Sequence, residues 1–300
     1  METEAMPEPK RLRMAVAQTT LRSDPSNSVQ LRESGREIRC LMCEAHEAGA
    51  RLVHFPEGAT CSPHKRIMSI AGCDQVGAAD WNRVQWDVLQ QELNQTAALA
   101  RELRLWVVLG SVHRLTPPHR PHNSLYVISE RGEVVTRYDE RMLSKTKLTF
   151  MYTPGSMPVT FQVDGLRFGC SVGMECQFTE VFSEYERLDV DCVLFSTAGP
   201  GTPNNRGVFA TQAQALAAMN SYWVSYAALT QSEGAPSGLI SPRGKWLVQC
   251  PQHGEPVMAV VDLDDSEPNL ARPWRRKVRD GIYEPHLVCN DARSNERQTF

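Results

Sequence analysis

Short apolar runs alternate with longer amphipathic stretches along most of the chain. In the longer stretches hydrophobic residues recur about every three to four positions, which is the spacing of one face of a helix. The predicted helices run from Ser28 to a stop at Gly49, through 89–100, over 180–188 and through 209–220. The predicted strands cover 13–19, 51–55, 105–112, 124–129, 134–138, 161–163, 166–172, 192–196, 223–229, 237–240, 245–249 and 257–263. This alternation indicates an α/β fold.

Three strand pairs are predicted, two of them from turn residues. Arg131-Gly132 lies between two strand-like runs, and Asp164-Gly165 lies between two others, so each dipeptide is typical of a β-hairpin turn. Residues 245–249 are predicted to pair with residues 257–263, which follow them in the chain.

The domain organisation is simple. No internal repeat, low-complexity tract or linker divides the chain, so residues 13–266 are expected to form one domain. Residues 1–12 are expected to be disordered or to lie on the surface. The polar tail, residues 267–300, is expected to lie on the surface or against a partner subunit.

Composition excludes several classes of protein. The 32 Lys and Arg residues against 35 Asp and Glu give a net charge of −3, which argues against a nucleic-acid or polybasic membrane partner. No secretory signal is recognisable, and no apolar run reaches the about 18 residues of a membrane span. The nine cysteines are an odd and sparse set for a disulfide scaffold. We therefore expect a cytoplasmic protein with reduced thiols.

A metal site is not expected. Cys40 and Cys43 form a C-x-x-C pair, and His46 follows one helical turn later. A zinc site needs a fourth ligand, and no second C-x-x-C supplies one. A buried helix face is therefore the favoured interpretation of this pair.

Three separated segments share the motifs of one family. Residues 54–58 (HFPEG) follow a strand, residues 152–155 (YTPG) precede a hairpin, and residues 169–180 (GCSVGMECQFTE) lead from a strand into a helix. Residues 191–194 and 241–244 add a further strand and a late turn. In their order and spacing these segments resemble the nitrilase, or carbon–nitrogen hydrolase, superfamily over roughly residues 13–264.

The resemblance implies a fold and a chemistry. The fold would be a four-layer α-β-β-α sandwich that forms a homodimer or a larger assembly, through the helix beginning near Glu180 and the C-terminal tail. The reaction would hydrolyse or condense amides, nitriles or carbamoyl groups with no metal or cofactor. The family uses a Glu, Lys and Cys triad, in which the carboxylate activates the thiol and the ammonium stabilises the oxyanion.

The nucleophile position departs from this pattern. Glu57 matches the family's base, but Gly173 occupies the position of the thiol. Gly169 before it, and Glu175 with residues 178–180 after it, fix that register. Cys170 and Cys176 lie three residues to either side, and buried structural cysteines are favoured over displaced nucleophiles at both positions.

The lysine position departs as well. Residues 138–143 (YDERML) place Glu140 where the family has its lysine, and the family's later acid falls near Lys147 or Leu148. This suggests a swapped charge pair, in which Lys145 or Lys147 returns the positive charge to the site. A solvated, charged loop is an equally good interpretation, and an arginine could also supply the charge.

Other residues complete the expected site. The Met174 N–H is a candidate oxyanion donor, beside Glu175 and Cys176. Thr197 and Asn204 belong to the strand end and the loop that line the substrate pocket in the family that this sequence resembles.

Three functions remain open. The first is an active carbon–nitrogen hydrolase or amide-forming enzyme, in which Glu57 activates a water held in the space that Gly173 leaves, or in which Gly173 is an engineered replacement of a cysteine. The second is a catalytically silent ligand-binding or regulatory protein, and the third is an oligomeric structural subunit. The expected partner in the first two is a small amide, nitrile or carbamoyl-type molecule, with no nucleic acid and no membrane.

Overall fold

The protein is described here by a computed structural model that covers residues 10–199, 207–230, 234–252, 254–264 and 271–295. The chain divides into two compact units, residues 1–266 and residues 267–300. The second unit contains the helices α5 (Ala271–Arg279) and α6 (Ala292–Asn295), with a short 3-10 turn at Glu284–His286 between them.

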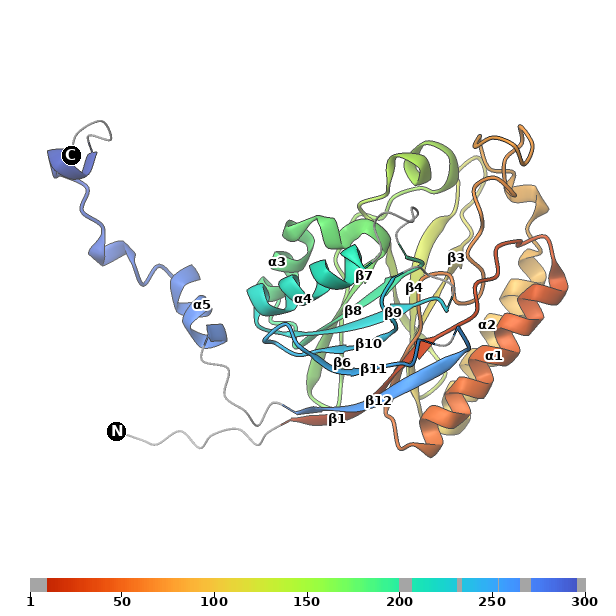
Figure 1. Ribbon diagram of the computed structural model, residues 1–300, viewed down its shortest axis with the longest axis horizontal. Coiled ribbons are helices and arrows are strands. Elements are labelled where there is room, and N and C mark those ends of the chain that lie inside the picture. The colour runs from red at the N-terminus through yellow and green to blue at the C-terminus, as the bar shows by residue number, and fades with distance from the viewer. Residues whose placement is uncertain (1–9, 200–206, 231–233, 253, 265–270, 296–300) are drawn as a thin grey trace. The chain divides into compact units, whose positions relative to one another are not determined.

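Two six-stranded sheets form the centre of the first unit. The first sheet has the strand order β12-β1-β2-β3-β4-β5, and the second has the order β11-β10-β9-β8-β7-β6 (Figure 1). The strands of the first sheet are β1 (Arg11–Gln18), β2 (Leu52–His54), β3 (Trp106–His113), β4 (His122–Ile128), β5 (Val134–Asp139) and β12 (Val257–Asp264). Those of the second are β6 (Thr160–Val163), β7 (Leu166–Val172), β8 (Cys192–Thr197), β9 (Trp223–Ala228), β10 (Gly238–Ile240) and β11 (Trp246–Gln249).

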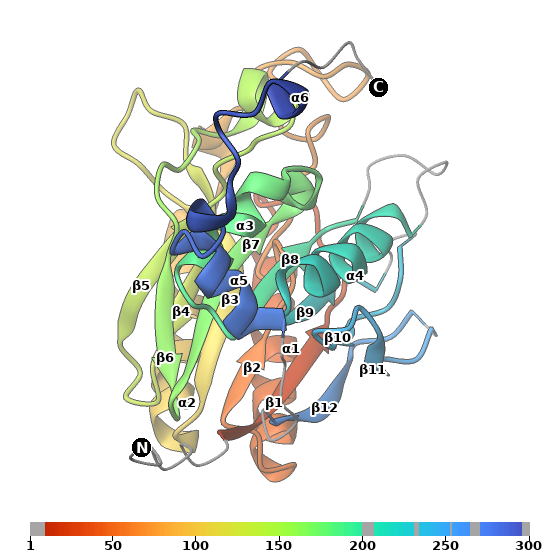
Figure 2. The same cartoon turned by 90° about the vertical axis from the view of Figure 1, so that its left-hand side faces the viewer.

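Helices cover the outer faces of both sheets. The helices α1 (Ser28–Glu47) and α2 (Trp86–Leu103) pack on the first sheet, and α3 (Thr179–Arg187) and α4 (Val208–Asn220) pack on the second. Figure 2 shows the same layers turned by 90°, with α4 lying over β9 and β10. The expected four-layer α-β-β-α sandwich is therefore confirmed.

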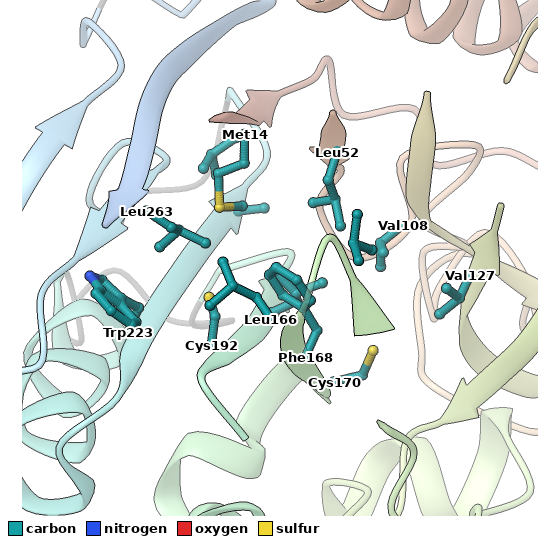
Figure 3. Close-up of a cluster of buried hydrophobic side chains, with 14 of the residues drawn as sticks. Met14, Leu52, Val108, Val127, Leu166, Phe168, Cys170, Cys192, Trp223 and Leu263 are labelled. Atoms are coloured by element: carbon teal, nitrogen blue, oxygen red, sulfur yellow. The ribbon is translucent and has the colours of Figure 1, made fainter. Parts of the chain in front are cut away.

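Side chains along a strand point alternately to the two faces of its sheet, and so contribute to two different cores. In β1, Met14 and Val16 belong to the core between the sheets, whereas Ala15 and Ala17 belong to the core under α1 and α2. This is the period of two expected for a strand that is buried on both faces. Figure 3 shows the core between the sheets, to which both sheets contribute, with Phe168 among the labelled side chains.

One predicted strand pairing is wrong. Residues 245–249 and 257–263 do not pair with each other: β11 pairs with β10, and β12 pairs antiparallel with β1 along its whole length, from Arg11↔Asp264 to Gln18↔Val257. The pairing with β12 satisfies the backbone groups of β1 that would otherwise form an open edge of the first sheet. The helix α1 begins at Ser28, the predicted residue, and Asn27 is its N-cap.

Candidate active site

Three strand ends of the two sheets, and the loop after one of them, carry the predicted site residues. Glu57 follows β2, Glu140 follows β5 directly, and Gly173 follows β7 directly and opens a 3-10 turn over Gly173–Gln177. Lys147 begins a π-helical turn, Lys147–Met151, in the loop after β5. The structure brings these four residues into one cluster.

Lys147 lies at the centre of the cluster. Its Nζ donates to Glu57 Oε1 at 2.6 Å and to Glu140 Oε2 at 2.7 Å. Burial disfavours the ammonium, but attraction by Glu140 and Glu57 outweighs it and raises the pKa of Lys147. Lys145, the other candidate, is exposed, so Lys147 is the lysine that supplies the positive charge.

Asn123 is a site residue that the sequence interpretation missed. Its Nδ2 donates to Glu57 Oε1 at 2.8 Å and to Glu140 Oε2 at 2.6 Å, so it bridges the same two oxygens as Lys147. The Ala198 N–H, after β8, donates to Glu57 Oε2 at 2.9 Å. The only sequence signal for Asn123 is a polar residue at the start of an apolar strand, which by itself points to no particular role.

Glu140 is the most deeply buried member. Its side chain has no exposed surface, and its Oε1 has no hydrogen-bond partner among the described residues. Burial raises the pKa of Glu140 to about 8, with Lys147 opposing the shift and Glu57 adding to it. A carboxyl group of this kind is protonated far more readily than an ordinary glutamate.

The motif at residues 152–155 holds Glu140 in place. The Gly155 N–H donates to the Glu140 backbone carbonyl at 2.9 Å. A Cβ on Gly155 would collide with the Asp139 carbonyl, so this close approach requires glycine. The turn therefore fixes the strand end from which Glu140 projects.

The surroundings of Gly173 leave no room for a side chain at this position. Its φ is +64°, and a Cβ built on it would lie 2.7 Å from Glu140 Oε1 and 3.0 Å from Lys147 Nζ. The expected opening for a water at this point is therefore not found, because the Glu140 carboxylate and the Lys147 ammonium occupy it. Glu140 and Gly173 are sterically complementary.

Glu175 ties the two halves of the site together. It was expected to line the pocket, and the structure instead surrounds it with protein donors. Its carboxylate accepts hydrogen bonds from Tyr138 Oη, from the backbone N–H groups of Arg141, Met142 and Val172, and from Ser171 Oγ. These bonds fix the segment after β5 against the turn after β7, and so position Glu140 beside Gly173.

Neither neighbouring cysteine lies in the cluster. Cys170 belongs to the core between the sheets, and Cys176 belongs to the core under α3 and α4, with its Sγ 3.3 Å from Gln212 Oε1. Burial raises the pKa of both thiols, which disfavours the reactive thiolate. Both cysteines thus have the surroundings of structural residues.

The remaining predicted residues are placed as follows. Met174 is half-buried and packs against the core under α3 and α4. Thr197 is buried at the end of β8, where its Oγ1 accepts from the Gly199 N–H at 2.9 Å. Asn204 lies outside the described residues.

A buried histidine links the strands that carry Glu57 and Ala198. His54 Nδ1 lies 2.8 Å from Ser225 Oγ, and His54 Nε2 lies 2.8 Å from Ser196 Oγ. Ser196 Oγ in turn donates to the Phe55 carbonyl at 3.1 Å, so Nε2 carries the proton in this arrangement. Burial lowers the pKa of His54 to about 3, which keeps it neutral. This network crosses from the first sheet to the second.

The described residues form neither a metal-binding cluster nor a membrane-spanning helix. No group of three or more His, Cys, Asp or Glu side chains is arranged there to hold a metal ion. No helix in the described ranges has the length and apolar character needed to span a membrane.

Comparison with known proteins identifies the family. Residues 13–271 match the carbon-nitrogen hydrolase family, whereas no curated protein sequence matches the chain. A mutant of the Nesterenkonia AN1 amidase from the nitrilase superfamily, with a cysteine replaced by alanine, is 21% identical with a TM-score of 0.69, over 95% of this chain and 100% of that one.

Two further amidase structures from Nesterenkonia have similar folds. One is 20% identical with a TM-score of 0.66, over 92% of this chain and 99% of that one. The other, a cysteine-to-alanine mutant in complex with butyramide, is 22% identical with a TM-score of 0.67, over 95% and 100%. At these identities the similarity establishes the fold, and the family match spans most of the chain. This chain belongs to the carbon-nitrogen hydrolase family.

Proposed function

We propose that this protein binds a small amide, nitrile or carbamoyl-type molecule at the Glu57–Lys147–Glu140 cluster and forms no thioester with it. The observation that carries the proposal is the position of Glu140. Its carboxylate lies where a side chain at position 173 would begin, 2.7 Å from the Cβ position. The cluster is therefore a polar site that has no nucleophilic side chain at the turn after β7.

The polar groups of the cluster suit a small polar ligand. Lys147 is 24% exposed and Glu57 is 9% exposed, so both are within reach of solvent, whereas Glu140 lies behind them. Lys147 uses two of its three ammonium protons on the carboxylates, which leaves one for a ligand. The butyramide complex of the Nesterenkonia cysteine-to-alanine mutant supports this, because that amidase binds an amide without the thiol.

Charge compensation argues against thiol-type catalysis. A lysine stabilises an oxyanion best when its charge is not already neutralised. Lys147 pairs with two carboxylates, and Glu57 accepts from Lys147, Asn123 and Ala198. The positive charge of Lys147 is thus already balanced by carboxylates, as expected for a binding site that does not turn over an acyl intermediate.

A second candidate function is slow hydrolysis by direct attack of water. The specific observation is the pKa of Glu140, which burial raises to about 8. A carboxyl group that keeps its proton can act as the acid, here Glu140 for the departing amine, while Glu57 serves as the base for the water. Without a covalent intermediate, one difficult step is not split into two easier ones, so turnover would be slow.

A binding and turnover experiment tests the proposal. Ligand-observed NMR with butyramide, propionitrile and a carbamate should show saturable binding for at least one of them, with no ammonia released over hours. Lys147→Met should weaken binding by about tenfold or more, since it removes a charged hydrogen-bond donor. Lys145→Met is the matched control and should leave binding unchanged.

Two outcomes would change the conclusion. Ammonia release that Glu57→Gln abolishes would favour the second candidate. An absence of binding for every ligand class would overturn the proposal itself.

The assembly and the location are also proposed. The polar tail and the family resemblance support a homodimer or larger oligomer in the cytoplasm. Light scattering at micromolar concentration should show at least a dimer, and a stable monomer would contradict the proposed assembly.

A further inference from the structure

Three arginines line a hollow at the end of the first sheet that is opposite to the cluster. Arg101 lies in the last turn of α2, Arg104 is the C-cap of that helix, and Arg131 lies in the turn between β4 and β5. Glu130 lines the same hollow, which has a volume of about 460 Å³. Arg104 precedes β3, whereas Glu57 follows β2, the parallel neighbour of β3, so the hollow is separate from the cluster.

The turn between β4 and β5 packs directly against α2. A Cβ on Gly132 would collide with the Ala97 carbonyl oxygen and would lie 3.0 Å from Arg101 Cβ. Gly132 also has φ +75°, a conformation that glycine adopts at no steric cost. This close approach holds Arg131, the neighbour of Gly132, beside the turn of α2 that carries Arg101.

The positive charge of the hollow is not balanced by its surroundings. Arg51 pairs with Glu130 at 2.7 Å and with Asp164 at 2.9 Å, and its Nη1 donates to the Arg104 backbone carbonyl at 2.9 Å. Arg51 therefore already serves both the acid that lines the hollow and the carbonyl at the end of α2. The three guanidinium groups that line the hollow make no hydrogen bond or ion pair with any residue in the described ranges.

We propose that this hollow binds a small molecule with two or more linked phosphate groups. A guanidinium presents parallel N–H donors that match phosphate oxygens, and it keeps its charge at every physiological pH. A carboxylate or a single phosphate offers too few charges and oxygens to engage three guanidinium groups at once. The volume lies in the usual range of small-molecule sites, about 300–1,000 Å³. A free polyphosphate chain and a nucleoside triphosphate share this chemistry.

Isothermal titration calorimetry with inorganic tripolyphosphate on the full chain tests the proposal, at about 150 mM salt. We expect saturable binding of one molecule per chain. The variants Arg101→Gln, Arg104→Gln and Arg131→Gln should each weaken binding by about tenfold or more, because each removes a charged donor. Arg36→Gln replaces an exposed arginine of α1 and is the matched control, which should leave the affinity unchanged.

Adenosine triphosphate distinguishes the two sources of the phosphate chain. Tighter binding of this nucleotide than of tripolyphosphate would identify a nucleotide as the ligand, and equal or weaker binding would identify the phosphate chain itself; both results support the proposal. If neither compound shows saturable binding up to about 1 mM, the proposal is overturned. It is also overturned if Arg36→Gln weakens binding as much as the three variants of the hollow do, since the attraction would then come from the surface charge as a whole.

Discussion

Replacing Gly173 by alanine should destabilise the protein through two separable effects. The backbone at Gly173 has φ +64°, which costs a residue with a Cβ about 1–2 kcal/mol. The added Cβ would also lie 2.7 Å from Glu140 Oε1, and overpacking of a buried site typically costs about 1–3 kcal/mol. Gly173→Ala should therefore lower the free energy of unfolding by about 2–5 kcal/mol.

A double-mutant cycle isolates the steric part. Glu140→Ala removes the carboxylate that the new methyl group would meet, so the double variant should be less destabilised than the sum of the single variants by about 1–3 kcal/mol. Glu140→Gln keeps the bulk of the side chain and serves as the control, since it should give no such relief. Urea denaturation followed by circular dichroism measures all of the free energies.

Two results would refute this reasoning. One is a cost below about 1 kcal/mol for Gly173→Ala, which would mean that the site has room for a side chain. The other is additivity of Gly173→Ala and Glu140→Ala within about 0.5 kcal/mol, which would mean that Glu140 does not occupy the space beside Gly173.

Three further predictions concern the same site. The cysteine of Gly173→Cys should be alkylated slowly by fluoroacetamide and faster once Glu140→Ala is added, and Lys147→Ala should cancel that gain. Peptide mass mapping measures the alkylation rates. Labelling of Cys170 or Cys176 in the unaltered protein at an equal rate would contradict the register. Because the pKa of His54 is lowered to about 3, the unfolded chain binds more protons than the folded one below about pH 6.5. The free energy of unfolding should then fall by about 2 kcal/mol between pH 7 and pH 5, and His54→Leu should remove this fall. If the urea midpoint shifts equally with pH in the unaltered protein and in His54→Leu, the role of His54 is refuted. Asn123→Leu should cost about 2–4 kcal/mol in urea denaturation, because two buried carboxylates lose a donor, and a cost below about 1 kcal/mol would show that Asn123 is dispensable.

Much of the fold could be predicted because its signals are local. Alternating runs such as that of β1 and amphipathic runs such as that of α1 show their buried faces in the sequence itself. The pairing of β12 could not be found in this way. It depends on which sheet edge is left open by distant strands, so β12 pairs with β1 and not with the nearer β11.

The site shows the same division between local and long-range information. The motifs gave the register at Glu57, Glu140 and Gly173, and the structure brings these residues together. The choice between Lys145 and Lys147 depended on the turn that begins at Lys147, which directs only one of the two ammonium groups inward. Asn123 was missed because its role arises from contacts with residues on other strands.

A crystal structure of the protein soaked with a small amide tests the central claim most directly, because it shows the cluster, the ligand and every sulfur atom together. The account predicts Lys147 Nζ within hydrogen-bond distance of both Glu57 and Glu140, and an intact amide held against Lys147 and Glu57 with no covalent bond to the chain. An acyl group on Cys170 or Cys176, or a Lys147 side chain turned away from the two carboxylates, would contradict it.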